Sequence, residues 1–367
     1  MTTGMQPKER LMSIDVLRGF DMLLIIFADH FFRNLHLGAK SPVSEFLAIQ
    51  FEHPDWLGFH IYDIIMPLFL FVVGAVIPFS MVNRIREAKR KSELYPHLIR
   101  RVIILFILGW IVQGNLLHFD IDEFRVFSNT LQAIAVGYFF SVLAFLYLSK
   151  KGRYILFVLC LILYAMILAL PNVPGIGNSE LLPDKNYAIY FDRLIMGRFD
   201  DRNQYTWLLT GLGFTATTLA GLFGGELLRA KLPKLKTFKY LVLLGITFIA
   251  LGLIWDIWHP IIKKLWTSSF VLFLGGICYL LLALFYWIVD IKGYRKWALP
   301  LNVIGMNAIT AYVLSHVFNF PKIADQILFG LEKYMGDYYQ MMTSIGGFGI
   351  LYLILWYMYK NKTFVKI

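Results

Sequence analysis

Long apolar stretches separated by short polar segments dominate the pattern of hydrophobic and polar positions along this chain. A helix of roughly 20 residues crosses a hydrocarbon layer about 30 Å thick. Backbone groups have no water partners inside lipid, and the alternation typical of a membrane barrel is absent, so each stretch is predicted to be helical. The predicted fold class is all-α, a polytopic membrane bundle of about ten transmembrane helices at residues 14–32, 60–82, 102–117, 129–148, 154–171, 205–228, 240–258, 267–289, 298–318 and 340–359.

Composition agrees with this pattern. Hydrophobic residues make up 58% of the chain and charged residues only 16%, with a mean hydropathy of +0.62, which excludes an ordinary soluble globular protein. No soluble appendage, low-complexity tract or clear repeat interrupts the chain, so residues 1–367 are predicted to form a single transmembrane domain. Gly221 and Gly225 are expected to allow close helix packing rather than to carry chemistry.

The net charge of +11 is unevenly distributed, and its distribution predicts the topology. Residues 83–101 hold seven lysines and arginines against two glutamates, which is typical of a cytoplasmic loop. The loops after the fourth, sixth, eighth and tenth stretches are also basic, so both termini are predicted to be cytoplasmic. The protein is expected in a bacterial inner membrane, in contact with lipid and with no nucleic-acid partner.

Charged and polar residues within apolar stretches are costly, so those that persist usually face the bundle interior or a wet cavity. One such set is predicted to line an outward-facing pocket: Asp29, His30, His53, Asp55, Trp56, Asp63, Asn129, Thr130, Gln132 and His316. A second, inner set is rich in basic residues that suit phosphates: Asp15, Arg18, Arg100, Arg101 and Lys292. The two cysteines, Cys160 and Cys278, both fall within predicted spans, and no metal site is predicted.

Several of these residues allow a structural interpretation as well as a functional one. His53 is either a proton acceptor for catalysis or an interfacial histidine bonded to a loop carbonyl. Asp29 is either the partner that orients His53 or an acceptor for a backbone amide. Asp63, four residues before Pro67, also suits a role at a helix kink, and Arg100 and Arg101 suit a topology signal. Spacing alone does not decide between these alternatives.

Several motifs resemble the heparan-α-glucosaminide N-acetyltransferase family, especially its bacterial relatives. The strongest are residues 13–21 (SIDVLRGFD), 53–59 (HPDWLGF) and 62–71 (YDIIMPLFLF). Weaker matches follow in order along the chain: Leu131-Gln132 with Tyr138, and residues 192–194 (DRL), 265–269 (LWTSS), 289–293 (VDIKG), 305–307 (GMN) and 364–367 (FVKI). The resemblance therefore extends over essentially the whole chain.

The resemblance implies a transmembrane acyltransferase that moves acetyl from cytosolic acetyl-CoA to the amine of a glucosamine-type sugar outside. It implies that His53 is catalytic, with Asp29 orienting it. We accordingly expect Trp56, Asp63, Asn129, Gln132 and His316 to bind the sugar. Arg18, Arg100, Arg101 and Lys292 are expected to hold the CoA phosphates, and Met306 and Asn307 to line the path of the pantetheine arm.

The family position matching Asp29 can be asparagine, and Ala133 stands where some members carry arginine, so the acceptor stays open. So does the choice between direct transfer with His53 as base and an acetyl-histidine intermediate. The family also suggests a homodimer. The competing function is a sugar or amino-sugar transporter, which the absence of an internal repeat disfavours. A structural scaffold explains the buried charges poorly.

Overall fold

The computed structural model describes residues 11–114, 119–170 and 172–365. Helices form nearly all of its regular structure, which confirms the all-α fold class. The described strands are two short ones, β1 (Asn172–Val173) and β2 (Gly177–Asn178), which pair antiparallel. Three parts of the predictions lie outside the described residues: the ends of two predicted spans, at 115–117 and 171, and residues 366–367 of the closing motif.

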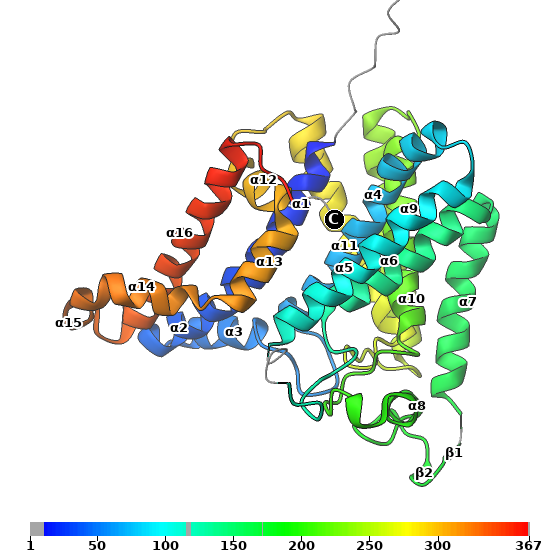
Figure 1. Ribbon diagram of the computed structural model, residues 1–367, viewed down its shortest axis with the longest axis horizontal. Coiled ribbons are helices and arrows are strands. Elements are labelled where there is room, and N and C mark those ends of the chain that lie inside the picture. Colours follow the sequence, from blue (N-terminus) through cyan, green and yellow to red (C-terminus); the bar gives the residue numbers. More distant parts are fainter. Residues whose placement is uncertain (1–10, 115–118, 171, 366–367) are drawn as a thin grey trace, which may run out of the picture.

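The helices form two groups that lie side by side (Figure 1). Figure 1 places α8 (Tyr187–Met196) and the two strands beyond one end of the larger group. The larger group contains α4 (Ile65–Glu87), α5 (Tyr95–Gln113), α6 (Thr130–Tyr147), α7 (Lys150–Leu168), α9 (Gly211–Arg229), α10 (Lys234–Asp256) and α11 (Ser268–Tyr286). The smaller group contains α1 (Met12–Leu23), α2 (Asp29–Ala39), α3 (Pro42–Gln50), α12 (Leu299–Met306), α13 (Ala308–Val317), α14 (Phe320–Leu328), α15 (Glu332–Met335) and α16 (Tyr339–Lys360).

Short helical segments join these helices. The π-helical segment η1 (Leu24–Ala28) makes α1 and α2 one continuous run, and the 3-10 segment η2 (Ile61–Ile64) leads into α4. The two groups meet where α1 packs against α4 and α11. The remaining segments are η3 (Lys91–Leu94), η5 (Gly197–Phe199), η6 (Trp287–Ile291), η7 (Phe329–Leu331) and η8 (Gly336–Tyr338).

Seven helical segments of the described residues are long and apolar enough to cross a membrane, by length and composition. They match seven of the ten predicted stretches and make this an integral membrane protein. The count of ten and the orientation of the termini stay predictions. The seven segments are Ile61–Glu87, Lys91–Gln113, Thr130–Tyr147, Lys150–Leu168, Lys234–Asp256, Ser268–Ile291 and Phe320–Lys360.

The other three predicted stretches are also helical, but each has a feature that sets it apart. The stretch 14–32 lies in the run from α1 to α2 and carries several charged side chains. The stretch 205–228 becomes helical only at Gly211, where α9 begins. The stretch 298–318 is divided at Asn307 into α12 and α13. Hydropathy averages over the late start at Gly211 and the break at Asn307, so it predicted one uninterrupted helix for each of these two stretches.

Glycines set the distance between α4 and α9, as predicted for Gly221 and Gly225. A Cβ added at Gly221 would lie 1.9 Å from the carbonyl oxygen of Phe71, and one at Gly225 would lie 2.1 Å from that of Ala75. Only glycine permits backbones to approach so closely. The packing role predicted for both glycines is therefore confirmed, and it fixes the position of α4, which begins at Ile65, two residues after Asp63.

Candidate active site

His53 lies between α3 and η2, and its imidazole contacts a buried carboxylate. Its Nδ1 is 2.9 Å from Oδ1 of Asp63, the third residue of η2. The Asp63 side chain is fully buried, whereas that of His53 is 37% exposed. A neutral imidazole that donates through Nδ1 keeps its lone pair on Nε2. With Asp63 accepting from Nδ1, the lone pair of a neutral ring lies on Nε2, which is also 3.3 Å from Nζ of Lys263.

The start of η2 holds the Asp63 carboxylate in place. The backbone N–H of His60 donates to Oδ2 of Asp63 at 3.0 Å, which satisfies one of the free N–H groups at a helix start. The His60 ring is held in turn, because its Nδ1 lies 2.9 Å from the carbonyl oxygen of Glu52. The backbone thus presents the second carboxylate oxygen, Oδ1, to His53.

A third side chain, Lys263, completes this group, which we call the His53 cluster (His53, Asp63 and Lys263). Lys263 comes from the loop between α10 and α11, and its Nζ lies 3.1 Å from Oδ1 of Asp63. The same Nζ lies 3.0 Å from Nδ1 and 3.3 Å from Nε2 of His53. Lys263 is 8% exposed, and burial lowers the pKa of its amine while the Asp63 carboxylate opposes that shift.

A backbone contact joins the two loops that meet at the His53 cluster. The N–H of Gly58 donates to the carbonyl oxygen of Ile261 at 3.2 Å. Gly58 has φ of +100°, a conformation that favours glycine. The loop that carries His53 is therefore fixed against the loop that carries Lys263.

Asp29, the predicted partner of His53, occupies a neighbouring pocket instead. Among the described residues no hydrogen bond or ion pair joins Asp29 to His53, and the carboxylate beside His53 is Asp63. Asp29 lines a cavity of about 710 Å³, the Asp29 pocket, together with His30, Tyr62 and His316. The Tyr62 ring lies 4.9 Å from the His53 ring, centroid to centroid, so this one side chain borders both the pocket and the cluster.

The other predicted sugar-binding residues are mostly engaged within the protein. Asn129 caps α6, accepting from the backbone N–H groups of Leu131 and Gln132. Gln132 is fully buried and bonds the backbone at Ser128 and Val126 through its two amide ends. Trp56 is largely buried, and its Nε1 donates to the carbonyl oxygen of Leu181 at 2.7 Å.

His316 is the predicted sugar ligand that does line the Asp29 pocket. Its Nδ1 lies 2.8 Å from the carbonyl oxygen of Tyr312, one turn earlier in α13. This contact leaves Nε2 for a ligand.

The four predicted phosphate-binding residues are spread over several elements. Arg18 pairs with Asp15 at 3.6 Å within α1. Arg101 stacks over the Tyr138 ring at 4.1 Å, and Lys292 lies 5.3 Å from the centre of the Trp287 ring. Arg100 is exposed on α5. None of the four is among the eight described residues that line the cavity containing Met306.

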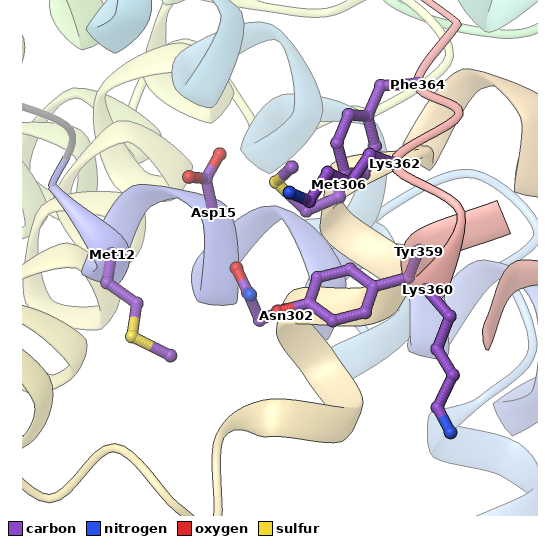
Figure 2. Close-up of a pocket in the computed structure, with 8 residues that line it drawn as sticks. All are labelled: Met12, Asp15, Asn302, Met306, Tyr359, Lys360, Lys362 and Phe364. Carbon is purple, nitrogen blue, oxygen red and sulfur yellow. The ribbon is translucent and has the colours of Figure 1, made fainter. Parts of the chain in front are cut away.

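Met306 lines a cavity of about 510 Å³, the Met306 pocket, shown in Figure 2. Its lining comes from the start of α1, from α12 and from the end of α16 with the tail that follows: Met12, Asp15, Asn302, Met306, Tyr359, Lys360, Lys362 and Phe364. Lys360 and Lys362 supply positive charge that sequence reasoning did not assign to a ligand. Asn307 is buried and instead holds the tail, bonding the carbonyl oxygen of Thr363 and the N–H of Val365.

Sequence reasoning missed Lys263, although a signal for it was present. The predicted topology puts the loop between α10 and α11 outside, where lysine is disfavoured, yet Lys263 and Lys264 stand there together. An exception to the charge rule at a predicted outer loop is reason to look for a specific partner. Within the described part of the chain, no group of three or more His, Cys, Asp and Glu is placed to hold a metal ion.

Comparison with known proteins agrees with the motifs. A scan against protein-family models gave no match. A human protein, heparan-alpha-glucosaminide N-acetyltransferase, is 24% identical over an alignment of 419 residues that covers 98% of this chain. The mouse protein of the same name is also 24% identical, and its alignment covers the whole chain. This chain is a distant relative of the heparan-alpha-glucosaminide N-acetyltransferases.

The relationship to these N-acetyltransferases concerns only part of their length. The chain spans 60% of the human relative and 62% of the mouse relative. The name of both relatives describes an acetyltransferase that acts on a glucosaminide. The resemblance stated from the motifs is therefore confirmed at the level of a distant family relationship.

Proposed function

We propose that this protein is a membrane N-acetyltransferase that moves acetyl from acetyl-CoA to the amine of a glucosamine-type sugar. The observation that carries this proposal is the His53 cluster, in which a partly exposed imidazole is held by a buried carboxylate. General acid–base catalysis needs a proton acceptor fixed in this manner. The relationship to N-acetyltransferases over nearly the whole chain supports the same reaction.

In the proposed reaction Nε2 of His53 accepts a proton from the sugar amine as the amine attacks the thioester carbonyl. A C–N bond forms, the C–S bond breaks, and the proton goes on to the leaving thiolate. Asp63 accepts a hydrogen bond from Nδ1–H and stabilises the imidazolium that forms, as carboxylates do beside catalytic histidines. An acetyl-histidine intermediate formed at Nε2 is the alternative route, and it uses the same side chains.

We place the sugar in the Asp29 pocket, because Tyr62 borders both this pocket and His53. Its lining combines hydrogen-bonding groups such as Asp29 and His316 with aromatic rings, a mixture that suits a polar ligand with apolar faces. Asn129, Gln132 and Trp56 then act as supports for the surrounding loops rather than as ligands.

We place the phosphates of CoA at the Met306 pocket, where Lys362 offers charge-assisted hydrogen bonds. Lys360 adds positive charge nearby, with its Nζ 5.5 Å from the centre of the Trp356 ring. The continuous run from α1 through η1 to α2 lines both pockets, with Asp15 in the Met306 pocket and Asp29 in the other. Asp29 follows Asp15 by fourteen residue steps, which corresponds to about 20 Å along the helical run. The donor and acceptor would thus approach from opposite ends of one helical run. The inner-membrane location and the cytosolic origin of acetyl-CoA belong to this proposal, as does a homodimer.

Replacing His53 by alanine tests the proposal. The rate of acetyl transfer to a panel of amino sugars, followed by mass spectrometry, is expected to fall by about 10²–10⁴-fold. Thermal stabilisation by CoA is expected to persist, because CoA binds the folded protein at another place. His60→Ala is the matched control, since its backbone N–H still bonds Asp63.

Retention of turnover in His53→Ala would exclude both routes. The transporter alternative is tested in the same samples. A carrier for sugars alone gains no stability from CoA in the absence of sugar, whereas an acetyltransferase does.

A further inference from the structure

Lys263 stands where its charge acts directly on His53. Its Nζ lies 3.0 Å and 3.3 Å from the two ring nitrogens of His53, and the Asp63 carboxylate lies 2.9 Å from Nδ1. An ammonium and a carboxylate at nearly equal distances act on a protonated imidazole with similar strength and opposite sign. The attraction from Asp63 is therefore largely offset by the repulsion from Lys263.

This balance matters because a base works only when it is unprotonated. A carboxylate alone within hydrogen-bond distance favours the imidazolium, an effect that amounts to roughly 1–3 pH units for close ion pairs. A protonated ring has no free lone pair, so it cannot accept a proton from the substrate. A like charge beside the ring opposes this.

We propose that Lys263 is a positioning residue that keeps His53 in its neutral, proton-accepting form by offsetting the charge of Asp63. Its own amine hydrogen-bonds Oδ1 of Asp63, so the carboxylate stays fixed beside Nδ1 while its charge is compensated. Asp63 thus orients the ring, and Lys263 sets the pH at which the ring becomes a base. This role rests on the proposed function of His53 as a general base.

The other groups that surround the cluster do not supply this compensation. Tyr62 faces His53 as a neutral ring, and the His60 ring is turned to the Glu52 carbonyl. Lys264 points elsewhere, with its Nζ 3.0 Å from Oε1 of Gln204. Glu52 and Asp55 are exposed, so solvent screens their charges.

The test measures how the reactivity of His53 depends on pH. Diethyl pyrocarbonate modifies only unprotonated imidazole, and peptide mass spectrometry reports the modification at position 53 separately from other histidines. The pH at which modification of His53 is half-maximal is the modification midpoint. It is compared with the acidic limb of the pH profile of acetyl transfer in wild type, Lys263→Met, Asp63→Asn and the double variant. Lys264→Met is the matched control, being the adjacent lysine. Stabilisation by CoA checks that each variant is folded.

We expect Lys263→Met to move both the modification midpoint and the acidic limb to higher pH by about one unit or more. Asp63→Asn should move them to lower pH, and the double variant should lie close to wild type because it lacks both charges. Lys264→Met should leave the midpoint unchanged. The double variant also avoids a lone buried charge, so it keeps the test valid if a single variant fails to fold.

An unchanged midpoint in folded Lys263→Met would overturn this role, as would a rate that falls by the same factor at every pH. A shift in the double variant as large as that in Lys263→Met would also overturn it. Failure of the proposed function looks different: wild type transfers no acetyl, while the modification midpoints still separate the variants.

Discussion

Substitution of Gly221 by alanine is expected to separate α4 from α9. The added Cβ would lie 1.9 Å from the carbonyl oxygen of Phe71, about 1.5 Å short of the 3.4 Å at which ordinary contacts begin. The obstructing atom belongs to the backbone, so a side-chain rotation does not relieve the clash. Gly74 and Gly225 make similar approaches in the same interface, and a shift at Gly221 loosens them as well. Overpacking of this kind costs about 1–3 kcal/mol or more.

The effect is measured as the thermal unfolding midpoint of purified protein in detergent. Gly349→Ala is the matched control: Gly349 lies within α16, and nothing lies within 4 Å of its added Cβ. Alanine there should stabilise the helix by about 0.5–1 kcal/mol. Gly221→Ala should unfold several degrees lower and lose acetyl transfer, because α4 continues the segment that carries Asp63. An unfolding midpoint equal to that of Gly349→Ala would refute the reasoning.

Two further predictions concern Asp192 on α8 and the Met306 pocket. Asp192 accepts from the backbone N–H groups of Trp207 and Leu208, and burial raises the pKa of its carboxyl to about 7. Because its pKa is raised, the protonated Asp192 carboxyl contributes up to about 4 kcal/mol to the free energy of unfolding. This contribution is fully present below about pH 4 and is lost as the pH rises to about 7. The unfolding midpoint should therefore fall more between pH 5 and pH 8 in wild type than in Asp192→Asn, and equal falls would contradict this account. Lys362→Ala should weaken CoA binding by roughly 10-fold, because one charge-assisted hydrogen bond is lost. The affinity is measured by titration with CoA. Lys333→Ala, a change at an exposed residue of α15, is the control and should keep the wild-type affinity.

The helical character of the chain could be predicted because apolar length alone requires it. Each of the seven segments suited to cross a membrane overlaps a predicted stretch, although Lys91–Gln113 and Phe320–Lys360 begin well before the predicted 102 and 340. The break at Asn307 could not be predicted in this way, because hydropathy does not distinguish one long helix from two short ones. The same limit applies to the late start of α9 at Gly211.

Local sequence also identified His53 and Asp63 as functional candidates, because motifs and charges within apolar stretches can be recognised from short segments of the chain. It did not identify which carboxylate contacts His53. Asp29 and Asp63 are equally plausible from spacing, and the choice depends on how η1 and η2 fold beside each other. The cations expected at one phosphate site are distributed over several elements, while Lys360 and Lys362 line the cavity.

The sequence by itself determined that the protein lies in a membrane, that its fold is helical and that it has a distant family relationship, because hydropathy and ordered motifs are properties of the linear chain. Only the tertiary structure brought Lys263, 210 residues further along, to within hydrogen-bond distance of His53. That contact depends on glycine-spaced helices and on the backbone bond between Gly58 and Ile261, which fix two loops against each other. The balance of charge around the proposed base is therefore a property of packing, which no local pattern encodes.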